Sequence, residues 1–268
     1  MKMDENFTID RAVAPGGRRT LPFTLPIGVT EEDGTVRREG SLRKMTGREE
    51  AILADTQNQR NGAKLVTELL SGCIVELGEK PVSPAIIANM YSADRNYLLL
   101  RLRAITFGPE LEASYKCPSC GHGWDVTEDL DDLPVRMLAE GERVETVPVE
   151  LDDGYVDKNG TLQTALVMRL PTGADESAVA PQMRKNASLG KNALLARCMV
   201  ALGDIPQHRL EAIGPKILVD LTMTDRRLID RALNSAAPGV DLIRPIECPA
   251  CGNEFKANLD LSRFLSVE

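Results

Sequence analysis

The sequence predicts an α+β protein that begins with a β-hairpin and helices and continues with short antiparallel strands. Three observations support this class. Apolar residues alternate with other residues over positions 21–29, which is typical of a half-buried strand. Helix-capping patterns recur along the chain. The motif Cys-Pro-x-Cys-Gly occurs twice, at Cys117–Gly121 and at Cys248–Gly252, and two such knuckles predict a four-cysteine zinc ribbon.

Size and composition limit the number of domains and argue against nucleic-acid-binding and membrane proteins. The chain has 268 residues, 43% of them hydrophobic, which is enough for one large domain or two small ones without disulfides. The net charge of −8 argues against a duplex nucleic-acid binder, and the aromatic content of 4% argues against a base-stacking surface. Positions 1–17 lack the apolar segment of a signal peptide, and no apolar run is long enough to span a membrane. We therefore expect synthesis and assembly in the cytoplasm and no membrane partner.

The patterns divide the chain into six expected segments. They are a flexible N-terminal arm (1–20), a β-hairpin (21–45), a helical segment (46–108), a first zinc knuckle (109–134), an α+β segment (135–245), and a second zinc knuckle with a C-terminal strand (246–268). Trp124 matches Phe255, Leu130 matches Leu261, and Leu133 matches Phe264 in the two knuckle segments. Apart from these paired knuckles, we expect no internal repeat.

Strand signals surround the helical segment. Pro22 and Pro26 interrupt the first strand, and a proline cannot donate to a strand ladder, so this strand is expected at a sheet edge. We hypothesise that the strand at 21–29, or the arm before it, contacts another subunit. Asp33-Gly34 predicts the turn into a second strand at 35–42, and Asn159-Gly160 predicts a later hairpin.

Helix starts are marked by capping residues. Thr46 and Thr172 begin capping patterns, Ser83 precedes a proline in a first turn, and Ser92 opens a further helix that ends at Gly108. Apolar periodicity predicts other helices over 62–77, 188–202 and 223–236.

The cysteine motifs predict a structural metal site. Thiolates select zinc or an iron–sulfur cluster over hard cations, and a redox pair or free thiols are the remaining readings. Four sulfurs from Cys117, Cys120, Cys248 and Cys251 complete a tetrahedral zinc site and leave no position open for catalytic water. Because 127 residues separate Cys120 from Cys248, one ion would join the middle of the chain to its end. His122 has no counterpart in the second copy and is expected outside the ligand set.

Catalytic patterns are missing from the sequence. It contains no phosphate-binding loop, dinucleotide fingerprint, nucleophile elbow or zinc-protease motif, and it has two histidines, His122 and His208. The acidic clusters at 129–132 and 150–153 are interpreted as solvated faces. Cys73 and Cys198 lie on apolar helix faces and are interpreted as buried core residues. No catalysis, cofactor-binding residue or small-molecule substrate is therefore expected.

An ordered series of short motifs resembles a known family. The series comprises Leu25-Pro26-Ile27-Gly28, Thr46-Gly47-Arg48-Glu49-Glu50, Ala93-Asp94-Arg95-Asn96-Tyr97 with the helix to Gly108, Arg169-Leu170-Pro171-Thr172-Gly173, and the final knuckle with Phe255. It is similar to baseplate proteins of contractile-tailed bacteriophages, the group related to the hub component of large myophages. The resemblance covers about 21–265.

The resemblance implies a structural component of a phage tail baseplate or hub, or of a phage-like contractile injection system. It implies zinc ligation by Cys117, Cys120, Cys248 and Cys251 without catalysis, partners among other tail proteins, and a place in the virion tail. Two alternatives remain open: a tail assembly chaperone absent from the finished particle, and a zinc-ribbon accessory protein associated with nucleic acid.

Overall fold

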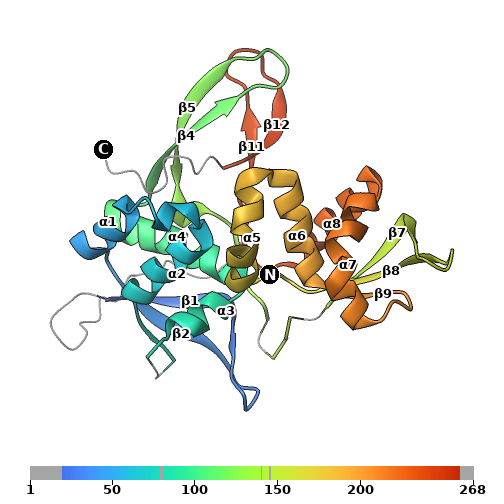
Figure 1. Cartoon of the computed structure of the whole chain (residues 1–268). Helices are drawn as coiled ribbons and strands as arrows, with labels where there is room; N and C mark the ends of the chain where they lie inside the picture. The colour runs from blue at the N-terminus through green and yellow to red at the C-terminus, as the bar shows by residue number, and fades with distance from the viewer. Residues whose placement is uncertain (1–19, 79–80, 140, 145, 260–268) are drawn as a thin grey trace.

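The computed structural model describes residues 20–78, 81–139, 141–144 and 146–259. It confirms an α+β fold of helices and short antiparallel sheets, in which two β-hairpins project together from the rest of the molecule (Figure 1). The expected N-terminal arm, apart from Thr20, and the end of the expected C-terminal strand lie outside the described residues. In the described part of the chain, no helix is both long and apolar enough to cross a membrane.

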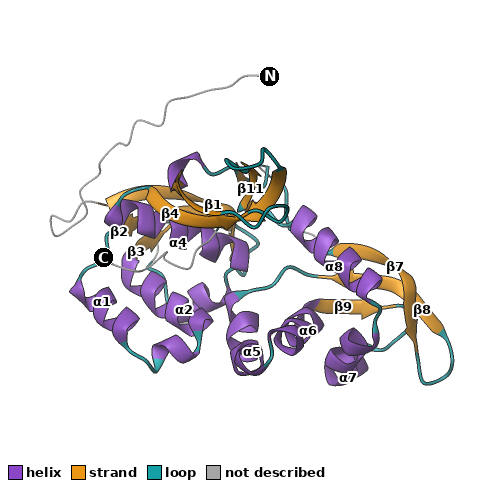
Figure 2. Cartoon of the chain, turned by 90° about the horizontal axis from the view of Figure 1, so that it is seen from above, coloured by secondary structure: helices purple, strands orange, loops and turns teal. Residues whose placement is uncertain are grey.

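The first half of the chain forms a three-stranded antiparallel sheet with helices packed against it (Figure 2). Its main elements are β1 (Thr20–Thr30), β2 (Val36–Arg43), α1 (Gly47–Ala54), α2 (Gly62–Cys73), β3 (Ile74–Leu77), α3 (Pro84–Asn89) and α4 (Ser92–Phe107). The strand order is β1-β2-β3, so β1 lies at a sheet edge as its prolines predict.

The second half repeats this order. Its elements are β7 (Val147–Val156), β8 (Leu162–Met168), α5 (Gly173–Lys185), α6 (Ala187–Cys198), β9 (Met199–Leu202), α7 (Gln207–Asp220) and α8 (Met223–Ala236). The strand order is β7-β8-β9, again antiparallel. In both halves, two strands, two helices, one strand and two helices follow in turn.

Matching details show that the two halves are copies. The first hairpin of each half has a register shift at equivalent positions, between Thr24 and Val29 and between Glu150 and Tyr155. Equivalent sequences include Asp33-Gly34-Thr35 and Asn159-Gly160-Thr161, Cys73-Ile74-Val75-Glu76-Leu77-Gly78 and Cys198-Met199-Val200-Ala201-Leu202-Gly203, and Asp94-Arg95 and Asp225-Arg226. The expectation that only the knuckles repeat is therefore wrong. The separation between equivalent residues varies from 126 at the capping threonines to 125 at Cys73 and Cys198 and 131 at the knuckles, which hides the repeat from a fixed-period comparison.

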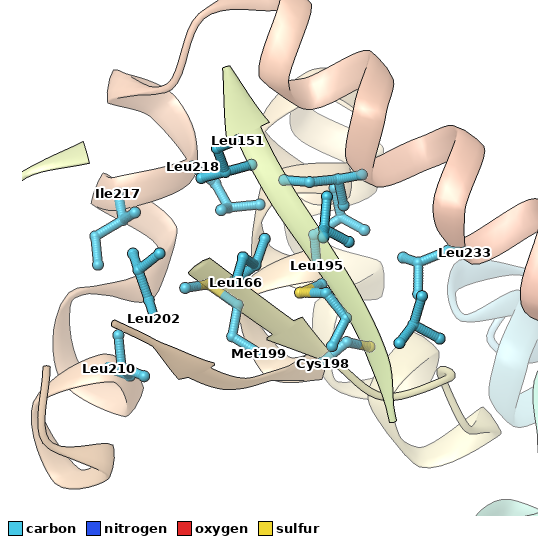
Figure 3. Packing of buried hydrophobic residues seen from close by; sticks show 14 of the residues in the cluster. Leu151, Leu166, Leu195, Cys198, Met199, Leu202, Leu210, Ile217, Leu218 and Leu233 are labelled. Carbon is cyan, nitrogen blue, oxygen red and sulfur yellow. The ribbon is translucent and has the colours of Figure 1, made fainter. Parts of the chain in front are cut away.

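The cores of the two halves are built from the same positions. Figure 3 shows the second core, where β7, β8, β9 and the helices meet. Equivalent buried pairs are Leu42 and Met168, Leu70 and Leu195, Cys73 and Cys198, Leu77 and Leu202, Ile87 and Leu218, Leu98 and Ile229, and Leu102 and Leu233. Both cysteines are buried, as the sequence predicts, and burial raises the pKa of each thiol to about 12.

The first helix of each half begins with a capping box whose carboxylate also pairs with an arginine. Thr46 and Thr172 cap α1 and α5 through complete capping boxes, which confirms both predicted helix starts. The capping carboxylate also pairs with an arginine from the preceding strand or its end: Arg43 bonds Glu49 at 2.8 Å, and Arg169 bonds Asp175 at 2.6 Å. Burial alone would raise the pKa of each carboxyl, but the bonds to the arginine and to the capping threonine outweigh burial and lower the pKa to about 2.

A buried aspartate near the start of the last helix fixes the first strand in each half. The Asp94 carboxylate accepts the backbone N–H groups of Ile27 and Gly28, both at 2.8 Å. The carboxylate of Asp225 accepts three successive backbone N–H groups of β7, at 2.7 to 3.3 Å. Burial raises the pKa of Asp94 to about 6 even though both N–H bonds oppose the shift.

These contacts occupy part of the β1 edge, and the contact expected between 21–29, or the arm before it, and another subunit stays a prediction. Pro26 accepts the backbone N–H of Leu138 at 2.9 Å, and Asp94 already occupies the next two N–H groups. The edge at 26–28 is thus completed within the chain.

Two predicted helices are too long. The helices expected over 62–77 and 188–202 end at Cys73 and Cys198, and each chain segment continues as a short strand, β3 or β9. Both strands complete the sheet of their own half. The helix predicted at 223–236 is confirmed as α8.

The two halves meet where the α3–α4 corner of the first contacts the start of α5 in the second. Ser92 donates its backbone N–H to Pro171 at 2.9 Å, and Gly173 donates to the carbonyl of Met90 at 3.1 Å. Arg95, in the first turn of α4 beside this contact, is 1% exposed. Its guanidinium donates to the backbone carbonyls of Ala63 in α2 and Ile87 in α3. A Cβ atom on Gly173 would lie 2.3 Å from Arg95 Cζ, so only glycine lets the halves approach this closely.

Gly173→Val is therefore expected to destabilise the protein by about 1–3 kcal/mol through overpacking at the junction. The matched control is Gly47→Val, because Gly47 begins α1 at the equivalent position and an added Cβ there meets only the Glu50 carboxylate at 3.9 Å. Urea unfolding of both variants, followed by circular dichroism, measures the difference. Equal losses of stability in the two variants would show that the close approach at Gly173 does not contribute to the free energy of unfolding.

Candidate metal centre

Two β-hairpins carry the cysteine motifs at their tips. The first joins β4 (Glu110–Lys116) to β5 (Gly123–Asp129), and the second joins β11 (Ile243–Glu247) to β12 (Glu254–Asn258). They lie side by side at the top of the molecule in Figure 1. Near their base, β6 (Val135–Arg136) pairs with β10 (Gly239–Val240).

The two turns have the same backbone geometry. Cys117 donates its N–H to His122 O at 2.9 Å, and Cys248 donates to Asn253 O at 3.0 Å. The glycine after the second cysteine, Gly121 or Gly252, takes φ of +75° or +67°, a conformation that favours glycine. Each turn therefore directs two sulfur atoms toward the other hairpin.

The four sulfur atoms of Cys117, Cys120, Cys248 and Cys251 lie within 4.8 Å of one another. Two distances between the hairpins, Cys117 Sγ to Cys251 Sγ and Cys120 Sγ to Cys248 Sγ, are 3.7 Å. A tetrahedral zinc with Zn–S bonds of about 2.3 Å requires sulfurs about 3.8 Å apart, whereas a disulfide requires about 2.05 Å. In the part of the chain that the structure describes, no other group of His, Cys, Asp or Glu side chains has comparable metal-ligand geometry.

The pKa values of the clustered thiols favour a bound cation among them. The backbone N–H groups of Cys120 and Ser119, with smaller contributions from neighbouring thiols, lower the pKa of the Cys117 thiol to about 6. The pKa of Cys251 is raised to about 12, because the neighbouring thiols and burial together outweigh the backbone N–H of Asn253. Four thiols this close cannot all ionise without a positive charge among them, and a divalent metal would supply that charge.

Other contacts also join the hairpins. Trp124 packs edge-on against Phe255 with ring centroids 6.2 Å apart, in agreement with their matched positions in sequence. The buried carboxylate of Glu128 accepts from Tyr115 at 2.9 Å in its own hairpin and from Arg244 of the other hairpin at 3.1 Å. No pattern in the sequence predicts this ion pair, because nothing there places 128 beside 244.

The remaining candidate residues do not converge. His122 is exposed and stacks on Trp124, and His208 is exposed in the first turn of α7. Asp131 of the first acidic cluster pairs with Arg101 at 2.7 Å, and Asp153 of the second accepts the Thr222 hydroxyl at 2.8 Å. The partners of Leu130 and Leu133 in the second knuckle lie outside the described residues.

Comparison with protein families gives a match over nearly the whole chain. The family described as T4 bacteriophage base plate protein matches residues 19–267. The chain belongs to this baseplate family. Comparisons with curated proteins and with solved structures gave no match.

Membership of the baseplate family confirms the resemblance seen in the sequence motifs. It supports a structural role in a phage baseplate, in company with other tail proteins of the virion. Both halves of the repeat and both cysteine hairpins fall within the matched residues.

Proposed function

We propose that this baseplate protein is a resident, non-catalytic component of a phage tail baseplate or hub, or of a phage-like injection system, in which a structural zinc holds the two halves together. The observation that carries the metal assignment is the cluster of four sulfurs, two from each half. The family match carries the assembly role.

The ligand set indicates why the metal would be structural. Cys117, Cys120, Cys248 and Cys251 fill all four positions of a tetrahedral zinc, so no position remains for a reacting water or substrate. The ion would supply only charge and fixed geometry. The cysteines would be held as thiolates, with backbone N–H groups such as that of Ser119, 3.4 Å from Cys117 Sγ, supporting the charge.

Energetics support a role in joining distant segments. Zinc binding by such thiolate sets is worth roughly 10–16 kcal/mol in small peptides. Closing a loop of more than 100 residues costs roughly 5 kcal/mol in chain entropy. A bound zinc would offset this cost and still stabilise the paired hairpins. A metal bridge of this kind would keep the two halves of the protein from separating.

Mass spectrometry of purified particles tests the role. We expect the chain in finished particles at a fixed ratio to other tail proteins. Its absence from particles, combined with failed tail assembly when its gene is deleted, would instead identify a transient assembly chaperone and contradict residence in the baseplate.

A further inference from the structure

The contact between the two halves uses a different surface on each half. The α3–α4 corner of the first half contacts the start of α5 in the second half. The repeat places an equivalent corner in the second half, at residues 219–223 between α7 and α8, and an equivalent helix start in the first half, at residues 45–50 around the start of α1. We call these the corner surface and the α1-start surface. The two lie in opposite halves of the molecule, with α1 on the side of the first half away from the second (Figures 1 and 2).

The corner surface carries exposed apolar side chains. Met223 is 63% exposed and Val219 is 53% exposed, whereas Ser92, the counterpart of Met223, is 8% exposed at the junction within the chain. Arg226, the counterpart of the fully buried Arg95, is only partly buried. The second half therefore lacks, within the chain, the cover that the first half receives.

The α1-start surface carries the counterparts of the two residues that face Arg95 at the junction within the chain. Gly47 matches Gly173, which lies against Arg95 in the chain, whereas an added Cβ on Gly47 would meet only the Glu50 carboxylate, at 3.9 Å. Glu50 is exposed and matches Glu176, whose charge acts on Arg95 across the junction. Placed against the corner surface in the same way, Gly47 and Glu50 would meet Arg226.

We propose that a second copy of this chain docks its α1-start surface onto the corner surface of the first, repeating between chains the contact that already joins the two halves. Such a contact is heterologous, since it uses a different surface on each copy. Every added copy leaves one surface of each kind free, so the product is a closed ring or an open helical array. This inference rests on the repeat and does not require the metal or the proposed residence in a baseplate.

The contact between copies is weaker than the contact within the chain. Ile27 and Tyr91 pack into the second core at the junction. Their counterparts, Asp153 and Thr222, are polar and bonded to one another at 2.8 Å. Reversible association with a dissociation constant in the micromolar range is therefore expected, and not a permanent oligomer.

Sedimentation velocity of the intact chain between about 1 and 100 µM spans the range in which such an association is visible. Wild-type protein is expected to show concentration-dependent association. Met223→Asp places a charge in the contact and is expected to weaken association at least about 10-fold, while an acidic residue in the first turn of α8 preserves the helix. Leu162→Asp is the matched control: Leu162 is 54% exposed but lies on the β7–β8 hairpin, outside both surfaces.

The second variant, Gly47→Trp, blocks the opposite surface; Gly47 is exposed, and an added Cβ there meets only the Glu50 carboxylate, at 3.9 Å. It is expected to weaken self-association as Met223→Asp does. Mixing the two variants is decisive, since each retains one intact surface: a mixture is expected to form a dimer that neither variant forms alone. A wild-type chain that stays monomeric to 100 µM, association unaffected by both variants, or a mixture without the dimer would each overturn the proposal.

Discussion

Cys248→Ser is expected to abolish stoichiometric zinc binding and to separate the two cysteine hairpins. The substitution removes one of four sulfurs, and serine is a poor ligand for zinc, so most of the roughly 10–16 kcal/mol available from such a site would be lost. The structure provides its own probe, because Trp124 is the single tryptophan in the chain and its indole contacts Phe255 of the other hairpin. The variant is expected to contain far less than one zinc per chain by elemental analysis, to show altered Trp124 fluorescence, and to be cleaved faster by protease between the hairpins.

The matched control for this experiment is Cys198→Ala. Cys198 is also buried, but it lies in the core of the second half and belongs to no group of potential ligands among the residues that the structure describes. This control is expected to lose about 1–2 kcal/mol of stability while keeping its zinc. A Cys248→Ser protein with full metal content, or with the protease resistance of wild type, would show that this cluster does not hold a structural zinc.

Asp225→Ala is expected to destabilise the second half by about 3–5 kcal/mol. The Asp225 carboxylate is fully buried and accepts the backbone N–H groups of Asp152, Asp153 and Gly154. Alanine would remove three part-buried hydrogen bonds at the bend of β7, and a hydrogen bond to a charged group contributes about 1.5–3 kcal/mol. Urea unfolding followed by circular dichroism measures the loss.

The control for Asp225 lies on the same helix. Asp230 of α8 pairs with Lys191 near the surface, and such exposed pairs contribute about 0–1 kcal/mol. Asp230→Ala is therefore expected to unfold close to wild type. If the two alanine variants unfolded at the same urea concentration, the buried aspartate would not be what holds β7 in place. Asp94→Ala tests the equivalent contact in the first half, with the same expected direction.

The sequence predicts the beginnings of helices better than their ends. Thr46 and Thr172 were found because a capping box is a local pattern that specifies a helix start. The ends at Cys73 and Cys198 were missed because a short apolar run that follows a helix fits a buried helix and a buried strand equally well. Sheet pairing with β2 and β8 decides in favour of the strand, and that pairing is not visible in the local sequence.

The repeat was missed for a related reason. The residues that the halves share are turn glycines, capping residues, the buried aspartates and core positions, and these are spread thinly along each copy. Insertions change their spacing. Pro84 lies in the first turn of α3, whereas its counterpart Pro215 lies inside the longer α7. The first position is typical of a helix start, and the second is typical of a helix break.

The candidate metal site was the easiest feature to predict. A knuckle turn needs cysteine, proline and glycine at fixed short spacing, so each half of the site is visible locally, and the donor count brings the halves together. The structure places all four sulfurs within 4.8 Å. The Glu128–Arg244 ion pair between the hairpins depends on how the strands lie side by side and has no such signature.

X-ray absorption at the zinc edge of the purified full-length protein shows whether the four sulfurs hold a zinc. We expect one zinc per chain, surrounded by four sulfur atoms at about 2.3 Å. Protein that carries no stoichiometric metal, or a metal bound through oxygen and nitrogen, would contradict the proposed zinc site.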